Sequence, residues 1–134
     1  MTRDETIKML AILKAAYPNS YKGMTKDEAN GMIAVWTMQF ADMPADIVLM
    51  ALNKLISTSQ FPPAISEVKK KISNLHWEAY DMISDKTTAA LLQDEEIAKY
   101  QRIYEITKRM KINTNLEPTL TEMMNGGTQK YLNG

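Results

Sequence analysis

The chain has 134 residues, a length that indicates one domain with room for a short tail. Sixteen basic residues balance sixteen acidic ones, and this neutrality argues against a protein whose affinity comes mainly from phosphate contacts. The absence of cysteine and the single His76 exclude disulfides, Cys nucleophiles and His-rich metal sites, and fit a reducing cytosol. No run of about 18 apolar residues is present, so we expect no membrane span, and the polar start differs from a signal peptide.

The first two predicted helices each begin with a capping box, in which a Thr hydroxyl and a Glu carboxylate satisfy amides at a helix start. Thr2 begins the first helix, whose expected apolar face consists of Ile7, Leu10, Leu13 and Tyr17. Thr25 begins the second helix, whose apolar stripe is the clearest in the chain and consists of Ala29, Met32, Ile33, Trp36 and Phe40. Gly31 lies inside this helix, and we interpret it as a close contact between helices.

Proline residues mark the next two predicted helices. Pro44 indicates the first turn of a third helix, whose apolar side consists of Val48, Leu52, Leu55 and Ile56. Pro62-Pro63 prevents this helix from continuing. A fourth helix is predicted from near Ile65 to about Ser84, because apolar positions 65, 68, 72, 75, 79 and 82 alternate by three and four. Scarce valine also favours helices over a sheet, so we expect an all-α protein with a bundle of four helices in residues 1–84.

The sequence changes character from about residue 85. Residues 88–111 contain helix formers and oppositely charged pairs such as Glu95 and Lys99, but few apolar residues. We therefore expect residues 85–111 to form a mobile or marginal helix that buries little surface. Residues 112–134, which include Pro118 and Gly126-Gly127, are predicted to form a flexible tail with a short apolar motif: Leu116, Leu120, Met123, Met124, Tyr131 and Leu132.

The sequence contains no recognisable catalytic or cofactor-binding constellation. His76 lies midway along the predicted fourth helix, where a surface or hydrogen-bonded histidine is far commoner than a general base. Neither of the glycine motifs that bind nucleotide phosphates is present. Asp94-Glu95-Glu96 is interpreted as a solvated helix face, because consecutive helical positions point in different directions. We therefore expect no catalytic residues, no metal, no cofactor and no enzymatic activity.

Two basic clusters are the candidates for phosphate contacts, Lys69-Lys70-Lys71 and Lys108-Arg109-x-Lys111. Glu67 and Glu105 lie one helical turn before them, and aromatic residues do not interleave with them. We therefore expect no direct nucleic-acid binding, although a helix-turn-helix stays open because that fold has a weak sequence signature. A helical bundle followed by a thinly apolar helix and a tail suits an adaptor that folds part of itself onto a protein partner.

Three segments carry a resemblance to a known family. They are Thr6–Leu10 with Tyr17-Pro18, then Ala34–Leu52, and then Phe61-Pro62-Pro63-Ala64-Ile65-Ser66-Glu67-Val68. Through these segments, and over roughly residues 1–80, the chain resembles the phage replicative helicase loader/inhibitor family, whose best-studied member comes from a Bacillus phage. Members of this family have a small helical N-terminal domain and a largely unstructured C-terminal region, and the resemblance implies the same division here.

The resemblance implies a non-enzymatic adaptor of phage DNA replication in the bacterial host cytoplasm. Such adaptors bind a DnaB-type hexameric helicase in its ATP-bound form, inhibit it and load it at the origin through a replisome organiser. By analogy the bundle faces the organiser and the tail grips the helicase, so the candidate partner-binding residues are Leu116, Leu120, Met123, Met124, Tyr131 and Leu132. Two alternatives stay open: a small helix-turn-helix DNA-binding replication or regulatory protein, and a tail that has no function.

Overall fold

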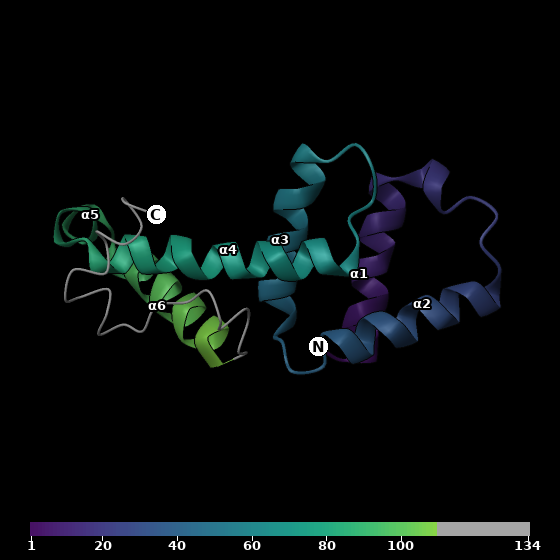
Figure 1. Ribbon diagram of the computed structural model, residues 1–134, viewed down its shortest axis with the longest axis horizontal. Coiled ribbons are helices and arrows are strands. Elements are labelled where there is room, and N and C mark those ends of the chain that lie inside the picture. The colour runs from purple at the N-terminus through teal and green to yellow at the C-terminus, as the bar shows by residue number, and fades with distance from the viewer. Residues whose placement is uncertain (110–134) are drawn as a thin grey trace.

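The computed structural model describes residues 1–109, and the regular secondary structure in this range is helical throughout (Figure 1). The elements in chain order are α1 (Arg3–Ala16), the short 3₁₀ helix η1 (Pro18–Ser20), α2 (Lys26–Gln39), α3 (Ala45–Thr58), α4 (Ile65–Ser84), α5 (Lys86–Leu91) and α6 (Asp94–Arg109). The predicted all-α class is confirmed. The six apolar tail positions lie outside the described residues, and the division of the chain into domains at residue 84 stays a prediction.

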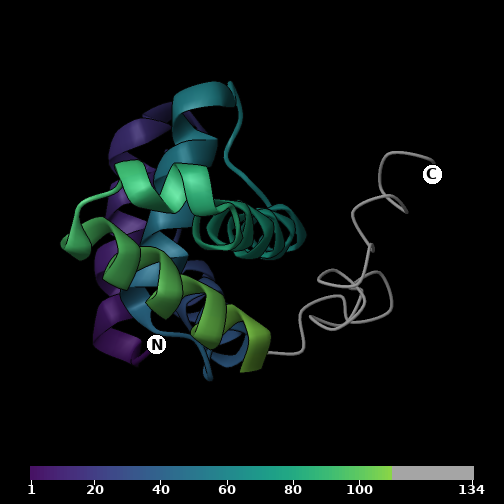
Figure 2. The ribbon, with the colours of Figure 1, turned by 90° about the vertical axis from the view of Figure 1, so that its left-hand side faces the viewer.

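The longest helix, α4, connects the two ends of the folded part. Figure 1 shows α1, α2 and α3 gathered at the beginning of α4, and α5 and α6 at its end. Figure 2 views α4 nearly end-on and shows α6 returning beside it. The chain therefore packs α4 against α3 with its first half and against α6 with its second half.

Local sequence signals place the helix starts as predicted. At α1 the Glu5 amide donates to the Thr2 hydroxyl at 3.2 Å, and the Thr2 amide donates to the Glu5 carboxylate at 2.9 Å. This hydrogen bonding lowers the pKa of the Glu5 carboxyl. At α2 the Glu28 amide donates to the Thr25 hydroxyl at 3.1 Å. Pro44 is the residue immediately before α3 rather than a residue of its first turn.

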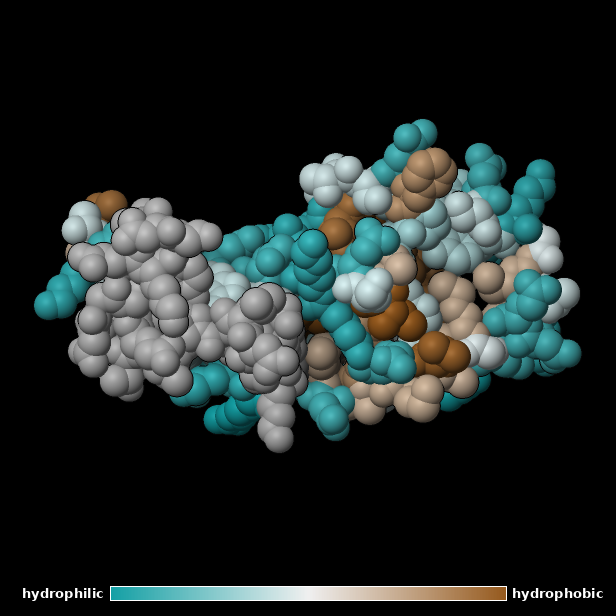
Figure 3. All heavy atoms as spheres, in the orientation of Figure 1, coloured by the Kyte–Doolittle hydropathy of each residue, from teal (hydrophilic) through white to brown (hydrophobic). Residues whose placement is uncertain are grey.

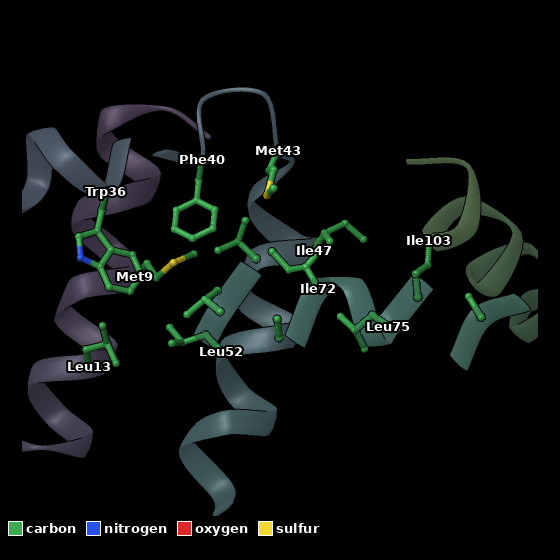
Figure 4. Close-up of a cluster of buried hydrophobic side chains, with 14 of the residues drawn as sticks. Met9, Leu13, Trp36, Phe40, Met43, Ile47, Leu52, Ile72, Leu75 and Ile103 are labelled. Atoms are coloured by element: carbon green, nitrogen blue, oxygen red, sulfur yellow. The ribbon is translucent and has the colours of Figure 1, made fainter. Parts of the chain in front are cut away.

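The core lies where α3 and the beginning of α4 meet α1 and the end of α2 (Figure 4). Its fully buried apolar side chains include Leu13, Phe40, Ile47, Val48, Ala51, Leu52, Val68 and Ile72. The predicted seam of α4 is confirmed at positions 68, 72, 75 and 79, which are buried. Burial of aliphatic and aromatic surface is therefore the main stabilising contribution in this region.

The predicted apolar face of α1 is partly wrong. Met9, Leu13 and the Thr6 side chain are buried, whereas Ile7 is 37% exposed and Leu10 only partly buried. The reason is that α1 packs against both α2 and α3. Its apolar residues therefore divide between two faces instead of one.

The interpretation of Gly31 as a close helix contact is also wrong. A methyl group at the Cα of Gly31 would meet no atom within 4 Å outside its own helix. The residue is exposed on the outer side of α2. No packing requirement in the described structure therefore explains glycine at this position.

The segment after α4 differs most from the prediction. A break at Leu92, whose backbone is extended, separates α5 from α6. The statement that this segment buries little is wrong, because Ile103, Tyr104 and Thr107 of α6 are buried. Their partners on α4 are aromatic and polar residues, which a count of aliphatic side chains underestimates. The mobility of the segment stays a prediction.

Candidate partner-binding surfaces

The sequence-predicted contact residues all belong to the tail, so the described structure brings none of them together. It does show where the tail begins, since α6 ends at Arg109. The described residues form three further surface features with the character of binding sites. These are a hollow beside the end of α6, a groove between α1 and α2, and an exposed phenylalanine on the α3–α4 connection.

The end-of-α6 hollow has a volume of about 650 Å³. It is lined by Met38, Gln39, Ala41, Asp42, Met43, Pro44, Lys69, Ile106 and Arg109. The Lys69 ammonium donates to the Gln39 side-chain oxygen at 2.7 Å and lies 5.8 Å from the centre of the Phe40 ring. The N-terminal ammonium fixes the α2–α3 connection, because it donates to the carbonyls of Phe40, Ala41 and Met43 at 3.2, 3.1 and 2.6 Å.

The α1–α2 groove has a volume of about 330 Å³ and is mainly apolar. Thr37 of α2 and Thr6 of α1 lie 2.9 Å apart through their hydroxyl oxygens, which joins the end of α2 to the beginning of α1. The two helices diverge from this junction towards the loop that connects them (Figure 1). The groove is lined by Ile7, Leu10, Ala11, Lys14, Tyr21, Lys22, Gly23, Met24, Ala29, Met32 and Ile33. Gly23 has a φ of +80°, a conformation that glycine adopts without strain.

Phe61 on the α3–α4 connection is 71% exposed, although the backbone beneath it is held firmly. The Tyr17 hydroxyl donates to the Ser59 carbonyl at 2.8 Å, and the Ser59 hydroxyl donates to the Phe61 carbonyl at 2.9 Å. Pro63, two residues further on, is buried. A rigidly presented aromatic side chain is typical of an anchor in a protein–protein interface. Hydrophobic surface gathers around α1, α2 and the beginning of α4, as Figure 3 shows.

His76 is a structural residue of the α4–α6 contact. Its Nδ1 atom lies 2.7 Å from the Thr107 hydroxyl, and its ring stacks on Tyr104 with the ring centres 4.8 Å apart. Burial lowers the pKa of the imidazole, against a hydrogen bond to the Tyr104 backbone that raises it, and Lys108 contributes in the lowering direction. The sequence-based interpretation of His76 as a hydrogen-bonded helix residue is confirmed.

The charged clusters show no assembled site within residues 1–109. Asp94, Glu95 and Glu96 are all exposed in the first turn of α6. No group of three or more His, Asp or Glu side chains in this range is arranged to hold a metal ion. The Lys108 ammonium lies 5.8 Å from the centre of the Tyr104 ring, so it stacks on the protein's own surface.

Nor does any helix among the described residues combine the length and apolar character that crossing a bilayer requires.

Sequence reasoning missed the α1–α2 groove, because it assigned Ile7 and Leu10 to the core. A signal was available: Met9 and Leu13 form a second apolar stripe on the same helix. Two stripes on one short helix indicate that one of them faces something other than the main core. Phe61 was recognised only as part of the family resemblance.

Comparison with known proteins identifies the first half of the chain. Residues 1–69 match the family model that describes the N-terminal domain of the phage gene 39 protein. No curated protein and no solved structure matches the chain. The matched range contains α1, α2, α3 and the first turn of α4, whereas helical structure continues to Arg109. The match covers more than half of the sequence, and the chain therefore belongs to the family of the N-terminal domain of the gene 39 protein, the helicase loader/inhibitor of Bacillus phage SPP1.

Proposed function

We propose that this protein is a non-enzymatic adaptor of phage DNA replication in the host cytoplasm. It binds a DnaB-type hexameric helicase in its ATP-bound form, inhibits it, and loads it at the origin through a replisome organiser. The observation that carries this proposal is the family match over residues 1–69. The neutral charge and the aromatic and apolar surface features support protein partners over a phosphate backbone.

The two partners are assigned to different parts of the chain. The helicase contact is placed in the tail, at Leu116, Leu120, Met123, Met124, Tyr131 and Leu132. The organiser contact is placed on the folded part, where Phe61 belongs to the family-matched range and is presented by a fixed backbone. This division gives one molecule two separate contact regions, as loading at an origin requires.

Inhibition follows from binding one helicase state more tightly than another. An adaptor that prefers the ATP-bound state shifts the helicase towards that state, by no more than the difference in its two affinities. The helicase is inactive if that state, or the bound adaptor, excludes single-stranded DNA. The organiser or DNA then releases it by competing for the contact.

The helix-turn-helix alternative has weaker support. In such a fold α2 and α3 would form the motif, with α3 as the recognition helix. The two charged residues of α3, Asp46 and Lys54, are paired with Arg102 and Glu78. The remaining polar side chains of α3 supply no positive charge for phosphate contacts.

Removal of the tail tests the proposal. A chain that ends at Met110 retains all described helices, so its circular dichroism should match the full chain while co-elution with the ATP-bound helicase is lost. A matched pair of full-length variants refines the test. Serine at Leu116, Leu120, Met123 and Met124 should weaken binding strongly, whereas serine at Asn113, Thr114 and Asn115 should leave it unchanged. Undiminished binding by the shortened chain would refute the tail assignment.

A further inference from the structure

The α1–α2 groove combines an apolar floor with positive charge at one end. Lys14 and Lys22 are the charged residues among its described lining, and no carboxylate accompanies them. Neither lysine is ion-paired with a described residue. The floor next to them is formed by Ile7, Leu10, Ala29, Met32 and Ile33. A complementary ligand therefore presents apolar side chains beside a carboxylate.

The tail of the same chain contains a segment with this chemistry. Residues 112–129 carry two charges, Glu117 and Glu122, and both are negative. The apolar residues of the segment are spaced four, three and one positions apart, which corresponds to one face of a helix: Leu116, Leu120, Met123 and Met124. Pro118 is suited to the first turn of such a helix.

The connection between α6 and this segment is long enough to reach the groove. Arg109 lines the same hollow as Met38 and Gln39, so the tail begins beside the end of α2. Ile33, at the near end of the groove, lies roughly 7 Å back along α2 at 1.5 Å per residue. Residues 110–115 span up to roughly 20 Å when extended. That length covers both this rise and a path around α2, whose diameter is about 10 Å.

We propose that residues 116–124 bind the α1–α2 groove of their own chain. The segment enters at Ile7 and Ile33, places its apolar face on the floor and brings Glu122 to Lys14 and Lys22. The lengths agree, since Ile7 to Lys14 and Pro118 to Met124 each correspond to about two turns of helix. If the proposed function holds, groove and helicase compete for one segment, and helicase affinity is reduced by the docked fraction.

A spin label on the tail tests this contact in the full chain without any helicase. The sequence contains no cysteine, so Asn125→Cys provides a single attachment site. We expect the methyl NMR signals of Leu10 and Met32 in the groove to be lost by paramagnetic broadening. The signal of Leu75, buried between α4 and its neighbours, should be retained.

Charge variants distinguish the groove from a general attraction. Lys14→Glu with Lys22→Glu should restore the Leu10 and Met32 signals, and adding Glu122→Lys should abolish them again. The matched control, Lys8→Glu with Lys26→Glu, makes the same change in net charge at exposed positions of α1 and α2 outside the groove. It should leave the broadening unchanged.

Two results would overturn the proposal. One is retention of the groove signals in the labelled full chain. The other is broadening that arises only when labelled chains are mixed with separate isotope-enriched chains, since the occupant would then be the tail of a second copy. Because the readout is intramolecular, loss of helicase binding in a separate assay bears on the proposed function and not on this contact.

Discussion

The family-matched region and α6 are held in place by different chemistry. Residues 1–69 enclose fully buried aliphatic and aromatic side chains such as Phe40, Ile47 and Leu52. By contrast, α6 is attached to α4 through the His76–Thr107 hydrogen bond, the Tyr104 ring stack and buried Ile103. Its Arg102 pairs with Asp46 at an exposed position, where an ion pair contributes little.

This difference implies that the two regions open at different free energies. A core of buried apolar side chains opens mainly on global unfolding, whereas an element with few buried residues can open locally. The tail continues from α6, so the element next to the proposed helicase contact is the less firmly attached one. The four predictions that follow test this contrast.

The largest effect is expected from Phe40→Ala in the family-matched core. Phe40 is 0% exposed, and removing a buried phenylalanine side chain costs about 3–5 kcal/mol of unfolding free energy. The other phenylalanine of the chain provides the control, because Phe61 is 71% exposed. Phe61→Ala should change the free energy by no more than about 0.5 kcal/mol in urea denaturation. Equal losses in both variants would contradict the assigned core.

Thr107→Val should loosen α6 alone. The substitution keeps the side-chain shape but removes the hydroxyl 2.7 Å from His76 Nδ1, which costs about 1–3 kcal/mol when a buried polar group loses its partner. Native-state hydrogen exchange should accelerate in α6 while the slowest amides of α3 change least. Thr87→Val, at an exposed position of α5, serves as the control. Equal acceleration in α3 and α6 would show that the two regions open together.

Acidification should weaken the same contact. Burial lowers the pKa of His76 below its ordinary value of 6.5, so the unfolded chain binds this proton more readily than the folded one. The contribution is complete above pH 6.5 and is lost as the pH falls below it. Hydrogen bonds lower the pKa of the Glu5 and Asp85 carboxyls, whose effects therefore appear at lower pH. His76→Gln should flatten the dependence of unfolding free energy on pH just below 6.5, and an unchanged slope would contradict this account.

The smallest effect is a gain. Gly31→Ala on the exposed side of α2 should raise the unfolding free energy by about 0.5–1 kcal/mol, because alanine loses less conformational entropy in a helix. A Cβ at this position meets nothing within 4 Å outside the helix. A loss of stability in thermal denaturation would show instead that the glycine is needed for packing.

The parts of the fold that depend on local signals could be predicted from the sequence. The capping box at Thr2 and the alternating seam at 68, 72, 75 and 79 both appear where expected. The contacts of α6 could not be predicted, because His76 and Thr107 are separated by 31 residues and form a polar pair. The division of the α1 apolar residues between core and groove also depends on where α2 packs. The tail contacts depend on a partner and therefore stay predictions.

The central claim is that the partner is a helicase and that phosphate is not the ligand. Fluorescence anisotropy of the labelled full chain, titrated separately with a DnaB-type hexamer in ATP and with duplex DNA at two salt concentrations, tests it most directly. We expect saturable binding to the ATP-bound hexamer and no binding to the duplex. Binding to the duplex that weakens steeply with salt, together with no binding to the hexamer, would contradict the account and favour the helix-turn-helix alternative.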